Sequence, residues 1–154
     1  DTLCESAEYL SPGIQVVVIG GEDAQVTRFK KKYHRVLFLG FLPYRDLANN
    51  QAIADVLVLP NTARDEISAR YTSPLKLFTY MASNRPIVAS NLPSIKEVLN
   101  EESAVFFEPD NARSLADAIN VLMTNRTHGE ELASHARALV ERYTWHERAK
   151  VILA

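Results

Sequence analysis

The sequence has very little cysteine and glycine. Among 154 residues there is one cysteine, Cys4, and there are five glycines. A single cysteine cannot form a disulfide within the chain, and it supplies no cysteine-based zinc site. Apolar residues make up 47% and charged residues 23% of the chain, which are ordinary values for soluble globular proteins and exclude disordered, collagen-like and fibrous classes. The length predicts a single domain, residues 1–154.

The chain also lacks a strong net charge, a signal peptide and a long apolar span. Its formal net charge is −2, so no long-range attraction to nucleic acid or anionic lipid is expected. Without a signal peptide or an apolar span, the default compartment is the reducing cytoplasm. The four histidines are scattered without the spacing of metal ligands, so no metal is expected.

Five short apolar runs recur along the chain. They are continuous rather than alternating and rich in Val, Ile and Phe, which is typical of parallel strands covered on both faces. The expected strands are 15–19, 36–39, 56–59, 86–89 and 104–107. Segments of helical character lie between and after them, at 24–32, 44–54, 74–83, 94–100 and 111–124. This alternation predicts an α/β fold with a Rossmann-like parallel sheet and helices on both faces.

The two ends of this α/β unit differ. After residue 127 a further helix is expected, and Thr144 to Glu147 fits the capping box of a last one. Residues 1–10 are typical of the end of a helix, yet no strand precedes them. We therefore expect the sequence to be a piece of a larger protein that lacks the first strand of this domain.

The longest loop, Pro60 to Thr72, has no hydrophobic periodicity, and long loops of this kind are usually functional or mobile. It leads into Ser73 and Pro74, which are preferred at the N-cap and first position of a helix. The amides of Leu75 and Lys76, the helix dipole and the Lys76 charge would together suit a phosphate. The alternative is that Ser73 and Pro74 merely begin a core helix.

Two other turns follow predicted strands, at the sheet edge where ligands gather. Gly20 and Gly21 permit a tight turn or a close backbone approach to a ligand. Phe41, Leu42 and Pro43 could hold a flat base, although a plain connector fits the composition equally well. Within the long loop, Asp65 and Glu66 are either a carboxylate pair or simply solvated. None of these features identifies a ligand by itself.

The run "SPLKLFTYMASNRPIVASNLPSIKEVL" resembles the carboxy-terminal domain of group 1 retaining glycosyltransferases, which have two Rossmann domains and use nucleotide-sugar donors. The resemblance extends from about residue 13 to 154 and includes "VVVIGG", "LFLGFLP", "ADVLVLP", "VFFEPDN" and "YTWHERAKVIL". It implies a donor-binding domain whose substrate is a nucleotide-diphosphate sugar, with no other cofactor. A glycan, lipid or small-molecule acceptor would be bound through an amino-terminal domain. The intact protein would then be cytoplasmic, or peripheral at the cytoplasmic face of a membrane.

The resemblance also implies roles for individual residues. Ser73, Pro74, Leu75 and Lys76 would hold the donor diphosphate. Residues 41–43 would meet the base. The loop through Tyr71 and Thr72, with Asp65 and Glu66, would lie beside the transferred sugar. No residue of this chain is expected to act as a nucleophile or general base.

The sequence departs from the family pattern at two positions. Thr79 stands where family members often have a glutamate that binds both ribose hydroxyls, and Tyr71 stands where they have a second acid. A hydroxyl accepts fewer and weaker bonds than a carboxylate, so weak ribose binding is expected. A catalytically decayed binding or scaffolding domain and a nucleotide-sugar epimerase of the same architecture remain as alternatives. A central strand, supplied by residues outside this sequence or by a partner chain, would complete the sheet.

Overall fold

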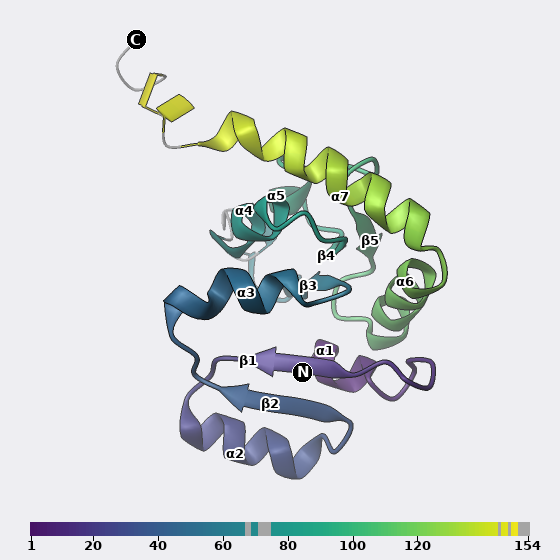
Figure 1. The fold of residues 1–154 in the computed structure, drawn as a ribbon. Helices are drawn as coiled ribbons and strands as arrows, with labels where there is room; N and C mark the ends of the chain where they lie inside the picture. The colour runs from purple at the N-terminus through teal and green to yellow at the C-terminus, as the bar shows by residue number, and fades with distance from the viewer. Residues whose placement is uncertain (67–68, 71–74, 145, 148, 151–154) are drawn as a thin grey trace.

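A computed structural model gives the fold of the chain (Figure 1), and it describes residues 1–154 except 67–68, 71–74, 145, 148 and 151–154. The strands lie within one or two residues of the five predicted runs, and all of their pairings are parallel as predicted. Their bounds are β1 Val16–Ile19, β2 Val36–Gly40, β3 Leu57–Leu59, β4 Ile87–Ser90 and β5 Val105–Phe107.

Helices alternate with these strands. Their bounds are α1 Thr2–Ser6, α2 Asp23–Lys32, α3 Leu47–Ala52, α4 Leu75–Ala82, α5 Pro93–Lys96, α6 Ala112–Thr124 and α7 Arg126–Val140, with short 3₁₀ helices at Tyr44–Asp46 and Glu141–Tyr143. The helix predicted over 44–54 is therefore divided into a 3₁₀ turn and a shorter α-helix. At the end of α7, Thr144 Oγ1 accepts a hydrogen bond from Glu147 N at 3.3 Å, which is one half of the predicted capping box.

The strands form two sheets, one of order β1-β2 and one of order β3-β4-β5. Among the described residues, no ladder joins β1 to β3. Figure 1 shows β1 between β2 and the three-stranded sheet, so the break lies within the row of strands. This is the position at which the sequence predicts a missing strand.

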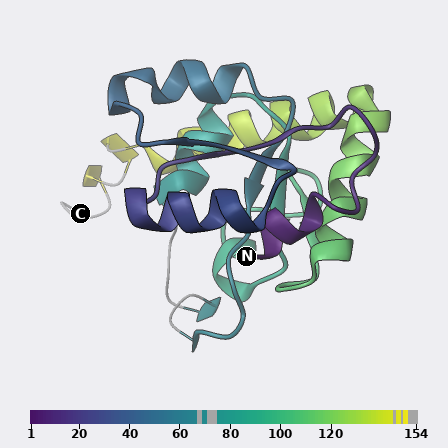
Figure 2. The same cartoon turned by 90° about the horizontal axis from the view of Figure 1, so that it is seen from below.

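Helices lie on two opposite sides of the strands (Figure 2), and α2 packs against β2. One core cluster joins both sheets, since Val16 and Phe38 share it with Val88 and Phe107, and α1, α2 and α6 contribute to it. A second cluster lies under α4, α5 and α7 and includes Leu59 and Ala89. Both sheets therefore belong to one α/β/α arrangement.

The prediction that every strand is covered on both faces is wrong for β1 and β2. Alternate residues of these strands face solvent, at 40–47% exposure: Val17, Ile19, Leu37 and Leu39. By contrast, all four residues of β4 are fully buried. The side chains of β4 enter both core clusters, Val88 in one and Ile87 and Ala89 in the other, so both faces of this strand are covered.

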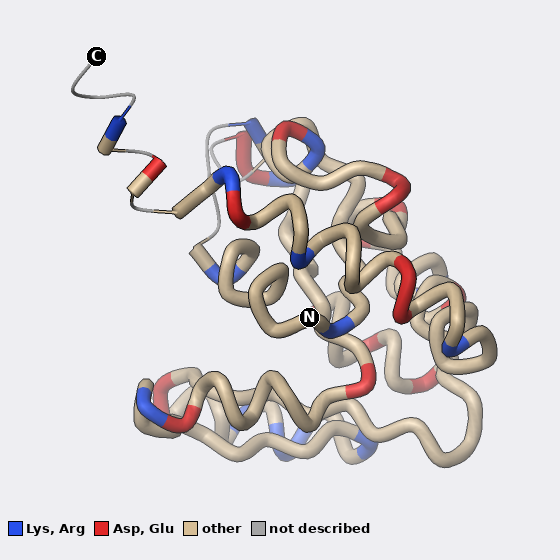
Figure 3. The backbone as a smooth tube through the Cα atoms, turned by 45° about the horizontal axis from the view of Figure 1, so that its top comes forward, with Lys and Arg blue, Asp and Glu red and all other residues tan. Residues whose placement is uncertain are grey.

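Charged residues of both signs are spread along the chain (Figure 3). The basic residues of α2 are exposed. In the part of the chain that the structure describes, no helix is both long and apolar enough to cross a membrane.

Candidate functional site

The candidate site lies at the carboxyl ends of the strands, which meet at one edge of each parallel sheet. Three loops leave this edge, after β1, β2 and β3, and each contains residues that the sequence singles out. The loops of a rigid parallel sheet are the usual place for ligand binding.

The structure describes α4 as Leu75–Ala82, within the helix predicted over 74–83, and the side chains of Leu75 and Lys76 are exposed. Leu77 and Met81 on its other face are completely buried. The helix packs against α7, and Phe78 contacts the ring of Tyr143 with centroids 5.2 Å apart. A core role and an anion-binding role can coexist in this helix, because one face is buried while Leu75 and Lys76 at its described start stay exposed. Ser73 and Pro74 lie outside the described residues.

Thr79 is tied into a side-chain bridge between α4 and α3. Its Oγ1 donates a hydrogen bond to Lys76 O at 2.9 Å and accepts one from Gln51 Nε2 at 3.2 Å. Gln51 is buried, at 7% exposure. A hydroxyl has one proton and two lone pairs, so one acceptor position of Thr79 remains for a ligand. Sequence reasoning did not identify Gln51, because only the packing of α3 beside α4 gives it a role.

The loop after β2 presents a large aromatic surface. Phe41 is 80% exposed and Tyr44 is 81% exposed, while Leu42 is half-buried and Pro43 is exposed. An aromatic side chain that is left so open next to a sheet edge is suited to contact with a flat ligand or another protein surface.

The glycine turn after β1 has the geometry that only glycine adopts readily. Gly20 and Gly21 have φ angles of 102° and 92°, and Gly40 has a φ of 71°. Gly20 N donates to Gly40 O at 2.7 Å, which joins the turns after β1 and β2. The glycines are therefore explained by backbone conformation at this turn.

The start of the long loop, residues 60–66, is called the pocket loop below. The hydroxyl of Ser90, at the end of β4, is fully buried; it donates to Asn61 O at 2.7 Å and lies 3.2 Å from Leu59 O. Asp110, which follows β5, accepts a hydrogen bond from Ala63 N at 2.9 Å. The same Asp110 Oδ2 lies 3.9 Å from Arg64 Nε. Side chains at or after the ends of two neighbouring strands, β4 and β5, thus form hydrogen bonds with the pocket loop.

The later part of the long loop contains a backbone hydrogen bond of helical type, although its sequence has no hydrophobic periodicity. Ala69 N donates to Asp65 O at 2.9 Å, which is the bond of a helical turn. Sequence periodicity could not detect it because a single turn is too short to produce a stripe. Tyr71 and Thr72 lie outside the described residues.

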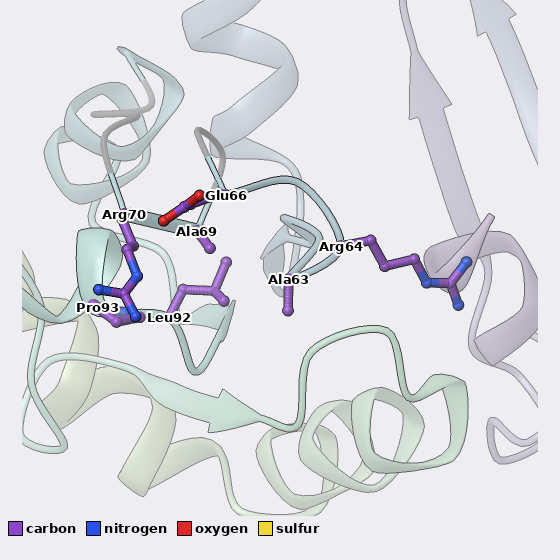
Figure 4. Close-up of a pocket in the computed structure, with 7 residues that line it drawn as sticks. All are labelled: Ala63, Arg64, Glu66, Ala69, Arg70, Leu92 and Pro93. Atoms are coloured by element: carbon purple, nitrogen blue, oxygen red, sulfur yellow. The ribbon is translucent and has the colours of Figure 1, made fainter.

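A pocket of about 420 Å³ opens beside this loop, lined by Ala63, Arg64, Glu66, Ala69, Arg70, Leu92 and Pro93. Figure 4 shows the Arg70 side chain running toward Leu92 and Pro93, whereas Arg64 extends in the opposite direction. Glu66 is exposed, so its carboxylate is accessible to a polar ligand. The pocket combines charges of both signs with an apolar floor, as sites for small polar molecules often do.

The described residues contain no group of three or more His, Cys, Asp or Glu side chains that could hold a metal ion. Among the described side chains near α4, Tyr80 has a shifted titration, because burial raises the pKa of its hydroxyl. At the described start of α4, the side chain of Lys76 contributes an amine.

Comparison with known proteins places this geometry in a family. A phosphatidyl-myo-inositol mannosyltransferase of Mycobacterium tuberculosis is 26% identical over 149 residues, which cover 92% of this chain and 38% of that protein. The chain therefore spans less than half the length of this relative. Two solved structures share the fold: HepE from Anabaena in complex with UDP, and the C-terminal domain of a group 1 glycosyl transferase, LpcC, from Francisella tularensis.

The first structure has a TM-score of 0.75 and 20% identity, and the match covers 92% of this chain and 40% of that one. The second has a TM-score of 0.76 and 20% identity, and the match covers 94% of this chain and 78% of that one. Residues 1–125 match the family described as glycosyl transferases group 1. The chain belongs to the group 1 glycosyl transferases.

Proposed function

We propose that this chain is the donor-binding half of a glycosyltransferase that moves a sugar from a nucleotide-diphosphate sugar to a glycan, lipid or small-molecule acceptor. The observation that carries the proposal is the start of α4, which presents Leu75 and Lys76 at the carboxyl edge of the sheet in a chain of this family. The complex of HepE with UDP, in a structure of the same fold, supports a nucleoside diphosphate as the ligand class.

The chemistry of such a transfer suits the start of α4. As the bond between sugar and diphosphate breaks, negative charge develops on the leaving phosphate. Backbone amides at a helix start and the amine of Lys76 stabilise an anion without needing to reorganise. Ser73 and Pro74 would precede these amides at the same place.

The remaining parts of the donor would extend to either side of the diphosphate. The sugar would occupy the pocket beside residues 60–66, where Glu66 can accept hydrogen bonds from hydroxyls, with Asp65, Tyr71 and Thr72 on the same loop. The base would lie on Phe41, Leu42 and Pro43. The ribose would meet Thr79, which has one acceptor position left over from its bonds to Lys76 and Gln51.

Calorimetric titration of the intact protein with UDP and with GDP tests the diphosphate site. We expect one of the two to bind, and Lys76→Ala to weaken its affinity by about tenfold, the size of one charged contact. Lys30→Ala, which removes an exposed amine on α2, is the matched control and should leave the affinity unchanged. Equal affinities in all three proteins would place the phosphates elsewhere.

A lipid acceptor at the cytoplasmic face of a membrane is our proposal for the other substrate. Its support is the name of the mycobacterial relative, a phosphatidyl-myo-inositol mannosyltransferase. Incubating the intact protein with labelled donor and either phosphatidylinositol vesicles or soluble oligosaccharides would distinguish the classes. Label that enters only the oligosaccharide would exclude a lipid acceptor.

One observation favours a second function, a decayed domain that binds nucleotide without transfer. Thr79 offers a ligand one acceptor position where a carboxylate would offer several. Retained UDP or GDP binding in an intact protein that neither transfers nor hydrolyses any nucleotide sugar would favour this function.

We also propose that a further parallel strand lies between β1 and β3 in the intact polypeptide, supplied by a segment outside residues 1–154. The two sheets share one core cluster but no ladder among the described residues. The half-exposed Val17 and Ile19 belong to β1, the strand next to this break. A β-branched strand there would pair with both neighbours and join the two sheets.

A further inference from the structure

The pocket loop is held by side chains that come from two other strand ends. Asn61, two residues after β3, accepts a hydrogen bond from the buried Ser90, and Ala63 donates one to Asp110. Ala63 and Arg64 are both lining residues of the pocket and both partners of Asp110. The shape of this wall of the pocket therefore depends on a residue that does not itself line it.

The backbone conformation and the exposure of Asp110 suit its contact with the pocket loop. Its φ angle is 60°, in the left-handed region that aspartate tolerates better than most residues. Its side chain is 19% exposed, compared with 81% for Arg64. The ion pair with Arg64 is thus an open contact of little strength. The hydrogen bond from Ala63 N, at 2.9 Å, joins a backbone amide to a charged acceptor, which is the stronger kind of hydrogen bond.

We propose that Asp110 is a positioning residue for transfer, which holds the pocket loop in the shape that orients the sugar of the donor. This inference rests on the proposed function. The diphosphate and base would bind to α4 and to the loop after β2, which Asp110 does not touch. Loss of the hydrogen bond between Ala63 N and Asp110, called the clamp below, should therefore impair turnover of a nucleotide sugar while the nucleotide alone still binds.

The test compares three variants of the intact protein. Asp110→Ala removes the acceptor, Asp110→Asn keeps an oxygen that can accept from Ala63 N, and Asp117→Ala removes an exposed carboxylate on α6 as the matched control. Each is assayed for nucleotide release from UDP-glucose and GDP-mannose, and for binding of UDP and GDP. We expect Asp110→Ala to lower kcat by about tenfold or more with the nucleotide Kd within about twofold of wild type. Asp110→Asn should recover most of the rate.

Amide exchange over residues 60–66 provides a readout that needs no turnover. Asp110→Ala should speed exchange at Ala63, whereas Asp110→Asn and Asp117→Ala should not. Unchanged exchange in Asp110→Ala, or an Asn variant as impaired in kcat as the Ala variant, would overturn the inference. A wild-type protein that binds neither nucleotide would instead refute the proposed function, and the exchange result would still decide whether the clamp exists.

Discussion

At the scale of single residues, Thr79 is the proposed contact for the ribose of the donor. Its hydroxyl is already engaged with Lys76 O and Gln51 Nε2. We predict that Thr79→Glu strengthens UDP or GDP binding by about tenfold, because a carboxylate can accept two charge-assisted bonds. Gln51 can still donate to the new side chain. Calorimetry on the intact protein measures the change, with Thr79→Val as the control that removes the hydroxyl; binding by the Glu variant that is no tighter than wild type would contradict the ribose assignment.

Tyr80, beside Thr79, gives a prediction about alkaline stability. Burial raises the pKa of its hydroxyl, so the folded state favours the neutral phenol. The resulting stability is complete below the ordinary pKa of about 10 and is lost as the pH rises through the folded-state pKa. Between about pH 9 and about pH 11, the wild type should therefore lose more free energy of unfolding than Tyr80→Phe, as urea titrations would measure. Equal losses would show that this hydroxyl is equally solvated in both states.

Several site residues were accessible from the sequence and others were not. The start of α4 and the glycine turn follow local rules of helix capping and backbone freedom, so the sequence predicts both positions. Ser90, Asp110 and Gln51 act on segments that are 28 to 47 positions away along the chain. No local pattern encodes such contacts. The available signal was only that Ser90 and Asp110 stand at or just after predicted strands.

At the scale of elements, strand positions were predictable, because short continuous apolar runs that alternate with helical segments are typical of buried parallel strands. The faces of the strands were not. Val17 and Leu37 read as buried in a continuous apolar run, but they are half-exposed, because burial depends on which distant segments pack on each face of the sheet. The sequence also did not predict the division of 44–54 into a 3₁₀ turn and α3, because the same residues suit a 3₁₀ helix and an α-helix.

The helix α6 allows a matched test of core packing. Leu115 is completely buried in the cluster that joins the two sheets, whereas Val121 on the same helix is 48% exposed. We predict that Leu115→Ala lowers the free energy of unfolding by about 2–5 kcal/mol, and that Val121→Ala lowers it by less than about 1 kcal/mol. Chemical denaturation of the intact protein gives both values. Similar losses for the two variants would mean that α6 does not anchor the core.

At the scale of the whole molecule, the proposed extra strand makes a prediction for amide exchange. In the three-stranded sheet, β4 is paired on both sides, whereas β2 is the outer strand of its pair. If a strand lies between β1 and β3 in the intact polypeptide, β1 should exchange as slowly as β4. Exchange of β1 as fast as that of β2 would exclude an inserted strand. Slow exchange that depends on protein concentration would indicate a separate partner chain.

The break between the two sheets also affects how residues 1–154 would behave when isolated. Ladder edges that find no partner among the described strands expose rows of amides and carbonyls, and the aliphatic side chains next to them favour contact with a similar surface. Copies of the isolated segment should therefore associate edge to edge as their concentration rises, giving oligomers or precipitate. Expression and storage of this segment would benefit from dilute conditions.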